Sequence, residues 1–114
     1  EKKDIDVRSF EKRSMEKIGL INEIIPRYRS TYFSHIFSGG YSAGYYAYLW
    51  AEVLDADAFQ PFVEKGVFDK ATAASFRENV LSKGNSDDPM TLYKRYRGAE
   101  PDPVYLLKNR GFVE

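Results

Sequence analysis

Residues 34–55 read SHIFSGGYSAGYYAYLWAEVLD and join a glycine-rich stretch to a tyrosine-rich predicted helix. Gly39, Gly40 and Gly44 reach backbone angles that are closed to most other residues. We therefore predict a hinge over residues 38–44, and directly after it a long helix whose first turns carry the tyrosines.

The tyrosines of this stretch keep a helical spacing. Tyr41, Tyr45 and Tyr48 are four and three residues apart. In a helix this spacing places their hydroxyls on one face, where they would donate hydrogen bonds to a ligand oxygen, including an oxyanion formed during acyl transfer. Glu52 is the only charged residue between residues 45 and 53, and a helix that is apolar on most sides is usually buried. A role in the core therefore competes with a role in ligand binding.

The rest of the chain carries the start and stop signals of short helices. Asp88-Pro89 and Asp102-Pro103 each pair an N-cap aspartate with a proline suited to the first helical position. Glycines follow the apolar periodic stretches, as they do at helix C-termini. No alternating strand pattern of useful length is present, so we predict an all-α fold, a helical bundle. The predicted helices are a first one closed by Gly19, then residues 31–37, 43–64, 70–83 and 89–97, and a last one from 103 to before Gly111.

The apolar residues of these helices define a predicted core. Pro61 lies inside the long helix and is expected to kink or divide it. Asp69 is expected to cap the helix that follows. The side chains predicted to face inward are Val7, Phe10, Met15 and Ile18 in the first helix, Ala73, Phe76, Val80 and Leu81 in the fourth, and Val104 and Leu107 in the last.

The composition restricts the function classes. The chain has 114 residues, 43% of them hydrophobic, which suffices for one domain with its own core. Its 17 basic and 17 acidic residues give a net charge of zero, which argues against a nucleic-acid-binding protein. It has no cysteine, so it can form no disulfide or thiolate metal site. No apolar run of about 18 residues is present, so no membrane span is predicted.

Several segments, in the same order, resemble a known family. They are residues 26–30 (PRYRS), 32–37 (YFSHIF), 45–52 (YYAYLWAE), 81–86 (LSKGNS), 88–90 (DPM) and 97–101 (RGAEP). Together with the hinge, they make roughly residues 8–114 resemble the C-terminal region of the thimet oligopeptidase–neurolysin family of zinc metallopeptidases. Within that family, the chain is most similar to the bacterial peptidyl-dipeptidase and oligopeptidase A branch.

The resemblance implies roles for individual residues. In that family the glycine-rich loop lies across the active-site cleft from the metal, and its tyrosines and a histidine contact the substrate. By this resemblance Tyr48 and Tyr41 are catalytic, because they correspond to tyrosines that stabilise the tetrahedral intermediate. Tyr45 and His35 correspond to residues that position the peptide backbone, and Gly39–Gly40 belongs to the same substrate-binding loop. His35 lies six residues before Tyr41, a spacing that differs from the five in animal enzymes.

The resemblance also implies parts that this chain lacks. The family binds zinc through a His-Glu-x-x-His helix, and the glutamate of that motif activates the zinc-bound water. The chain has a single histidine, so it cannot supply two imidazole ligands. We therefore expect residues 1–114 to be one C-terminal helical segment of a longer, mostly helical zinc peptidase, and the opening Glu1–Lys3 to follow a cut within it. The chain itself is expected to bind no zinc and to be inactive alone.

The implied activity is hydrolysis of short peptides, with release of C-terminal dipeptides favoured over internal cleavage, in the bacterial cytoplasm. The expected partners are a short peptide, the N-terminal remainder of the enzyme, and a second copy of the chain through exposed apolar surface. Nucleic acid and membranes are not expected partners. The alternative function is a free-standing helical module that binds peptides without cleaving them.

Other kinds of site have less support from the residues. His35 taken alone would be a packed histidine, and with its neighbouring serines it does not make a hydrolase triad. Glu52, Asp55 and Asp57 lack the spacing of a calcium loop, so capping or ion pairing is the better interpretation. Residues 39–44 resemble a phosphate-binding loop only in their glycines, because no strand precedes them and no lysine follows.

Overall fold

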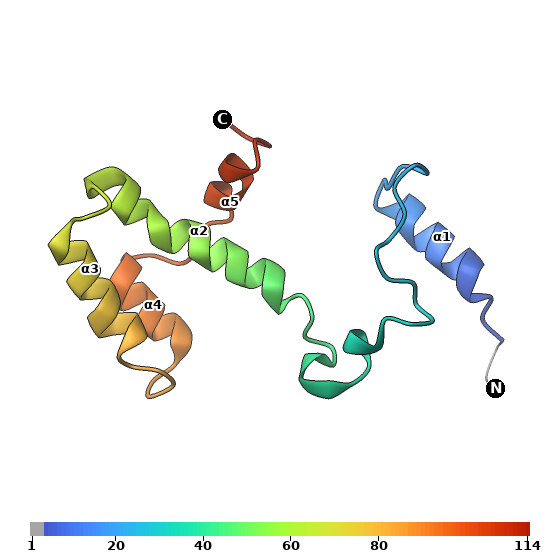
Figure 1. Cartoon of the computed structure of the whole chain (residues 1–114), viewed down its shortest axis with the longest axis horizontal. Helices are drawn as coiled ribbons and strands as arrows, with labels where there is room; N and C mark the ends of the chain where they lie inside the picture. The colour runs from blue at the N-terminus through green and yellow to red at the C-terminus, as the bar shows by residue number, and fades with distance from the viewer. Residues whose placement is uncertain (1–3) are drawn as a thin grey trace. The chain divides into compact units, whose positions relative to one another are not determined.

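A computed structural model describes residues 4–114, which divide into two compact units (Figure 1). The first unit ends at Tyr46 and the second runs from Ala47 to Glu114. Every regular element within residues 4–114 is helical and none is a strand, which confirms the predicted all-α fold. The division falls just after the predicted hinge.

The first unit opens with helix α1, Val7–Lys17. Asp6 caps it, because its carboxylate accepts hydrogen bonds from two backbone N–H groups of the first turn. The helix ends before Gly19, whose φ of 77° is readily adopted by glycine, and this end was predicted. The expected apolar face is incompletely covered, since Phe10 and Ile18 are exposed.

An irregular connector follows α1 and leads to two short 3₁₀ helices, η1 (Ser34–Ile36) and η2 (Gly39–Tyr41). The predicted helix over residues 31–37 is reduced to the single turn of η1. Such turns are short because their hydrogen-bond geometry is poorer than that of an α-helix.

The second unit opens with the longest helix, α2, Ala47–Lys65. The sequence predicted a helix from residue 43, so the predicted start is wrong by four residues. Ala43 has a φ of 52°, in the left-handed region that does not continue an α-helix. The predicted single helical face of Tyr41, Tyr45 and Tyr48 is therefore also wrong, because only Tyr48 lies in α2.

Pro61 was expected to kink or divide the long helix. It does not divide it, because α2 continues through Pro61 to Lys65. A proline has no N–H, so the carbonyl four residues earlier, that of Asp57, loses its helical donor. The Arg97 side chain replaces it, with Nε 3.2 Å from the Asp57 carbonyl oxygen. Next to it, the Tyr96 hydroxyl donates to the Ala58 carbonyl at 2.7 Å. Side chains from another helix thus satisfy the backbone around the proline.

Three more α-helices complete the second unit, and Figure 1 shows α4 running along α3. They are α3 (Lys70–Phe76), which continues into a π-helical segment η3 (Arg77–Leu81), α4 (Pro89–Arg97) and α5 (Val104–Asn109). The predicted caps Asp69 and Asp88 accept backbone hydrogen bonds at 2.8 Å, and Gly98 ends α4 with a φ of 81°. The predicted caps at Asp69 and Asp88 and the predicted helix end at Gly98 are therefore confirmed.

The core of the second unit differs in part from the predicted one. Ala73, Leu81 and Leu107 are exposed instead of inward, whereas Phe76, Val80 and Val104 are half-buried. The buried apolar residues are Val53, Ala56, Pro61, Leu92 and Tyr93. The predicted inward residues were chosen by helical periodicity, which locates a stripe but does not say which part of it a neighbouring helix covers.

A buried carboxylate joins three parts of this unit. Asp57, on α2, has 1% of its surface exposed. It accepts hydrogen bonds from the Tyr93 hydroxyl at 2.5 Å, from Arg97 Nε at 3.1 Å and from the Asp102 backbone N–H at 3.4 Å. Burial, and then the hydrogen bond to Asp57, raise the pKa of the Tyr93 phenol, so it stays protonated and donates. This network fixes α4 and the segment before α5 against α2.

Candidate functional site

Three of the predicted site residues lie together in the first unit. His35 sits on η1, Tyr41 ends η2, and Tyr45 lies in the turn that follows. The ring of His35 is centred 5.6 Å from that of Tyr41 and 5.5 Å from that of Tyr45. The two tyrosine rings are 5.8 Å apart and nearly perpendicular. The folded loop, and not a helical face, brings these rings together.

Backbone and hydroxyl hydrogen bonds close the loop that holds the three rings. The Ser38 hydroxyl donates to the Ser34 carbonyl at 3.1 Å, and the Ser42 hydroxyl to the Gly39 carbonyl at 3.1 Å. Gly39 has a φ of 71°, which explains why glycine occupies this position. Gly40 has no such requirement, because its φ is ordinary and a β-carbon at this position would have open space around it.

Two aromatic residues outside the predicted set of site residues support the site. The Phe33 ring meets the Tyr45 ring edge-on, with centres 4.9 Å apart and planes at 85°. The Phe33 ring also stacks on the Tyr28 ring, with centres 4.8 Å apart and planes at 21°. Phe33, Tyr28 and Tyr45 are all half-buried. Tyr28 and Phe33 lie in two of the segments that resemble the family, and this resemblance is the sequence signal that could have identified them.

Tyr48 lies in the second unit, on the first turn of α2, and 55% of it is exposed. One turn further along the same face, Glu52 forms an ion pair with Arg110, which follows α5. Tyr46, which precedes α2, is 72% exposed. The predicted catalytic residues Tyr41 and Tyr48 thus belong to different units.

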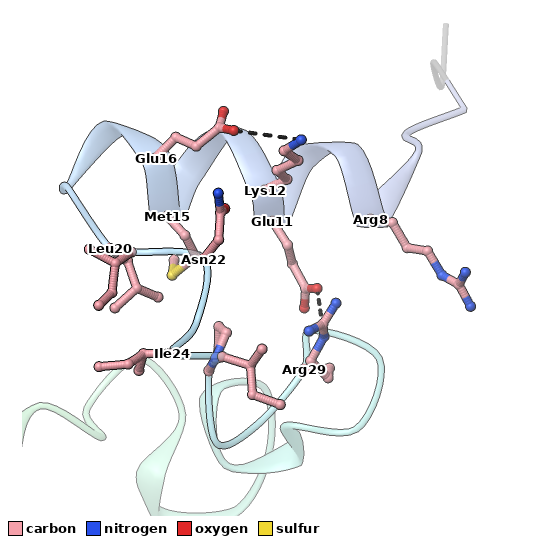
Figure 2. A pocket seen from close by; sticks show the side chains of 12 residues that line it. Arg8, Glu11, Lys12, Met15, Glu16, Leu20, Asn22, Ile24 and Arg29 are labelled. Atoms are coloured by element: carbon pink, nitrogen blue, oxygen red, sulfur yellow. Dashed lines mark ion pairs between the residues drawn. The ribbon is translucent and has the colours of Figure 1, made fainter.

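A groove in the first unit was not predicted (Figure 2). It has a volume of about 310 Å³ and lies between α1 and the connector. Its apolar lining includes Ile21, Ile24 and Ile25, which are exposed. Charged side chains of α1 lie along it, and Glu11 points to Arg29 of the connector, with Oε2 3.0 Å from Nε.

Glu11 also fixes the connector backbone. Its other carboxylate oxygen accepts the Ser30 N–H at 2.5 Å. This backbone hydrogen bond, supported by the Ser30 hydroxyl and the Arg29 charge, lowers the pKa of Glu11 below its ordinary value of 4.5. The connector is therefore held to α1 at the two residues that directly follow Tyr28.

The chain's residues do not fit a zinc site. Its one histidine and lack of cysteine leave carboxylates as the only other strong ligands. Within residues 4–114, no three histidine, aspartate or glutamate side chains converge to hold a metal ion. What the site offers is hydrogen bonding: phenol hydroxyls and an imidazole, all able to donate to a carbonyl oxygen. No helix in the described part of the chain is both long and apolar enough to span a bilayer.

The chain matches one family model and several known peptidases. The family model described as Peptidase family M3 matches residues 1–112. Oligopeptidase A of Escherichia coli (strain K12) is 57% identical over 79 residues, which are 69% of this chain and 12% of that protein. Dipeptidyl carboxypeptidase of the same organism is 48% identical over 107 residues, 93% of this chain and 16% of that protein. Saccharolysin of Saccharomyces cerevisiae is 38% identical over 79 residues, 69% of this chain and 11% of that protein. The chain thus spans only a small part of the length of these relatives.

Proposed function

Because the chain belongs to peptidase family M3, we propose that it is the C-terminal segment of a zinc peptidase that hydrolyses short peptides. In this proposal the chain supplies one wall of the substrate cleft. The observation that carries it is the gathering of His35, Tyr41 and Tyr45 on one hydrogen-bonded loop. Zinc, which would supply the Lewis acid, is held by residues outside this chain, so the chain alone is inactive.

The tyrosines act as hydrogen-bond donors in this proposal. Tyr48 and Tyr41 donate to the carbonyl oxygen of the scissile bond as it gains negative charge, and such donors act mainly in the transition state. Tyr45 and His35 bind the peptide backbone and hold the substrate in register. Gly39 and Gly40 give the loop the shape that presents these side chains.

We further propose that the product is a C-terminal dipeptide. Relatives named dipeptidyl carboxypeptidase match 92–93% of this chain, whereas those named oligopeptidase A match 69–71% of it. The two kinds of peptidase differ in what they require of the peptide's end. A dipeptide-releasing enzyme measures from the free C-terminus, whereas an enzyme that cuts internally does not.

Product analysis on the complete protein distinguishes these activities. An N-acetylated hexapeptide with a free C-terminus should lose successive dipeptides, detected by mass spectrometry. The same peptide with a C-terminal amide should be cleaved poorly. Equal cleavage of both peptides at an internal bond would show that dipeptide release is wrong, while leaving the peptidase proposal in place.

The role of Tyr48 is tested by Tyr48→Phe in the complete protein. This change removes one hydroxyl and keeps the ring, so the fold should survive. Losing one donor to the oxyanion lowers turnover by roughly 10²–10³-fold, and the Michaelis constant should change much less. Steady-state kinetics on the free-acid hexapeptide measure both quantities.

Tyr41→Phe and Tyr46→Phe complete the comparison. Tyr41→Phe should lower turnover in the same way but less, because Tyr41 lies on the loop and not on α2. Tyr46→Phe is the matched control and should keep ordinary kinetics, since Tyr46 is exposed and has no assigned role. If Tyr46→Phe is as damaging as Tyr48→Phe, or if Tyr48→Phe keeps full turnover, the assigned roles are wrong.

A further inference from the structure

Phe33 occupies a central place among the rings of the first unit. Its ring stacks on Tyr28 at 4.8 Å, meets Tyr45 edge-on at 4.9 Å and lies 6.2 Å from His35. Perpendicular and offset-stacked arrangements are the preferred geometries of aromatic pairs, so each contact favours one orientation of both rings. The orientation of Tyr45 is thus coupled to Phe33, which lies outside the hinge.

We propose that Phe33 is a positioning residue for Tyr45, and that Tyr28 holds Phe33 in place. The inference rests on the proposed function of Tyr45 in binding the peptide backbone. Phe33 has no polar side-chain atom and is half-buried, so it offers the peptide no hydrogen bond of its own. In this proposal its effect on the reaction passes through the Tyr45 ring that it contacts.

The loop needs such support because of its own sequence. Glycines give the hinge many accessible backbone conformations, which would leave the Tyr45 hydroxyl poorly placed. A displacement of about 1 Å in a positioning group is enough to reduce a catalysed rate strongly. A fixed ring outside the hinge restores a defined position through its contact with the Tyr45 ring.

The support continues from Tyr28 to α1. The Arg27 guanidinium lies over the Tyr28 ring, 5.2 Å from its centre. The next two residues, Arg29 and Ser30, are bound by the Glu11 carboxylate of α1, as Figure 2 shows for the Arg29 pair. The Glu11 contacts thus hold the backbone directly after Tyr28, and ring contacts lead from Tyr28 through Phe33 to Tyr45.

The test uses four variants of the complete protein: Tyr45→Phe, Phe33→Leu, Phe33→Leu combined with Tyr45→Phe, and Phe37→Leu. Tyr45→Phe loses one hydrogen bond and should lower kcat/KM about tenfold. Phe33→Leu should give a similar loss, divided between kcat and KM in the same proportions, with little change in melting temperature. Phe37→Leu is the matched control, because it makes the same substitution four residues further along the same segment. It should leave the kinetics unchanged.

The double variant separates positioning from general damage. If Phe33 acts through Tyr45, the double variant should be no slower than Tyr45→Phe alone, whereas independent effects would multiply. Phe33→Tyr, which keeps the ring, should retain ordinary kinetics. The inference is overturned if the losses multiply, if Phe33→Leu is as active as the unmodified enzyme, or if its loss follows a fall in melting temperature.

Failure of the proposed function gives a different result. If Tyr45→Phe itself has ordinary kinetics, Tyr45 does not bind the peptide, and the positioning role of Phe33 falls with it. If Tyr45→Phe is impaired and Phe33→Leu is not, the proposed function stands and only the inference is wrong.

Discussion

Asp57 joins several parts of the second unit through its hydrogen bonds. Its buried carboxylate accepts hydrogen bonds from Tyr93, Arg97 and the backbone before α5. Its carbonyl accepts a hydrogen bond from Arg97 in place of the N–H that Pro61 lacks. A buried charge is costly unless it is paired and hydrogen-bonded, and here both conditions are met. Removing the carboxylate therefore leaves Arg97, with only 17% of its side chain exposed, without its partner.

We predict that Asp57→Ala lowers the free energy of unfolding by about 3–5 kcal/mol, the usual cost of breaking a buried ion pair. Asp55→Ala is the control, because Asp55 lies on the same helix and is exposed. It should change the free energy of unfolding by about 0.5 kcal/mol or less. Urea unfolding followed by circular dichroism measures both. Equal effects of the two substitutions would show that the Asp57 network does not stabilise the fold.

The site residues were only partly accessible to sequence reasoning. His35, Tyr41 and Tyr45 were named from the resemblance, and the structure gathers them, although their chemical roles stay predictions. Asp57 was grouped with Glu52 and Asp55 as an acid for capping or ion pairing, and it does form an ion pair with Arg97. Its burial was not predicted, because its partners lie 36 to 45 residues further along the chain. No local pattern reports a contact at such a separation. The support from Phe33 was missed for the same reason, since ring packing depends on how the loop folds.

At the scale of the elements, helix ends that carry a capping residue were predicted better than ends without one. Asp88 and Gly98 act through atoms within a few residues, so their sequence signals suffice. The start of α2 was predicted wrongly because Ala43 adopts a left-handed conformation that its residue type does not announce. Pro61 was expected to disturb α2, and the tertiary contacts that accommodate it could not be read from the helix alone.

The contact between α1 and the connector should depend on pH. The pKa of Glu11 is lowered in the folded protein, so the ionised form is the one that the folded state favours. The stabilisation is therefore complete above the ordinary glutamate value of 4.5 and is lost as the pH falls through the lower folded value. We predict that this contact weakens in acid and is unaffected by pH between 6 and 8.

Nuclear magnetic resonance can follow this titration at one atom. The Ser30 amide proton should shift with a midpoint below 4.5, because it donates directly to the Glu11 carboxylate. In Glu11→Gln, which has a similar shape and no titration, this shift should disappear. A Ser30 midpoint at or above 4.5 would contradict the hydrogen bond, as would an unchanged titration in the Gln variant.

At the scale of the whole molecule, the surface is larger than compact units of this size expose. The described structure has 9427 Å² of accessible surface, whereas two separate compact units of these lengths would expose roughly 7,700 Å² in total. Many large apolar side chains are exposed, and Phe68, for example, is 94% exposed. Contiguous apolar surface that is left exposed is typical of regions that contact another protein. The proposal that this segment packs against the remainder of a longer peptidase accounts for it.

The isolated chain should therefore bind a hydrophobic dye and associate with itself. Ile24 and Ile25 are exposed along the groove of the first unit and add to this surface. Replacing both with serine should reduce dye fluorescence and association while leaving helix content unchanged, because neither residue is in a helix or buried. Sedimentation over a range of concentrations and dye titration measure the two effects.

In the complete protein the remainder should cover these side chains, so the same double substitution should lower its melting temperature. A strictly monomeric isolated chain that binds no dye would contradict the prediction, and an unchanged melting temperature would show that the groove faces solvent in the enzyme.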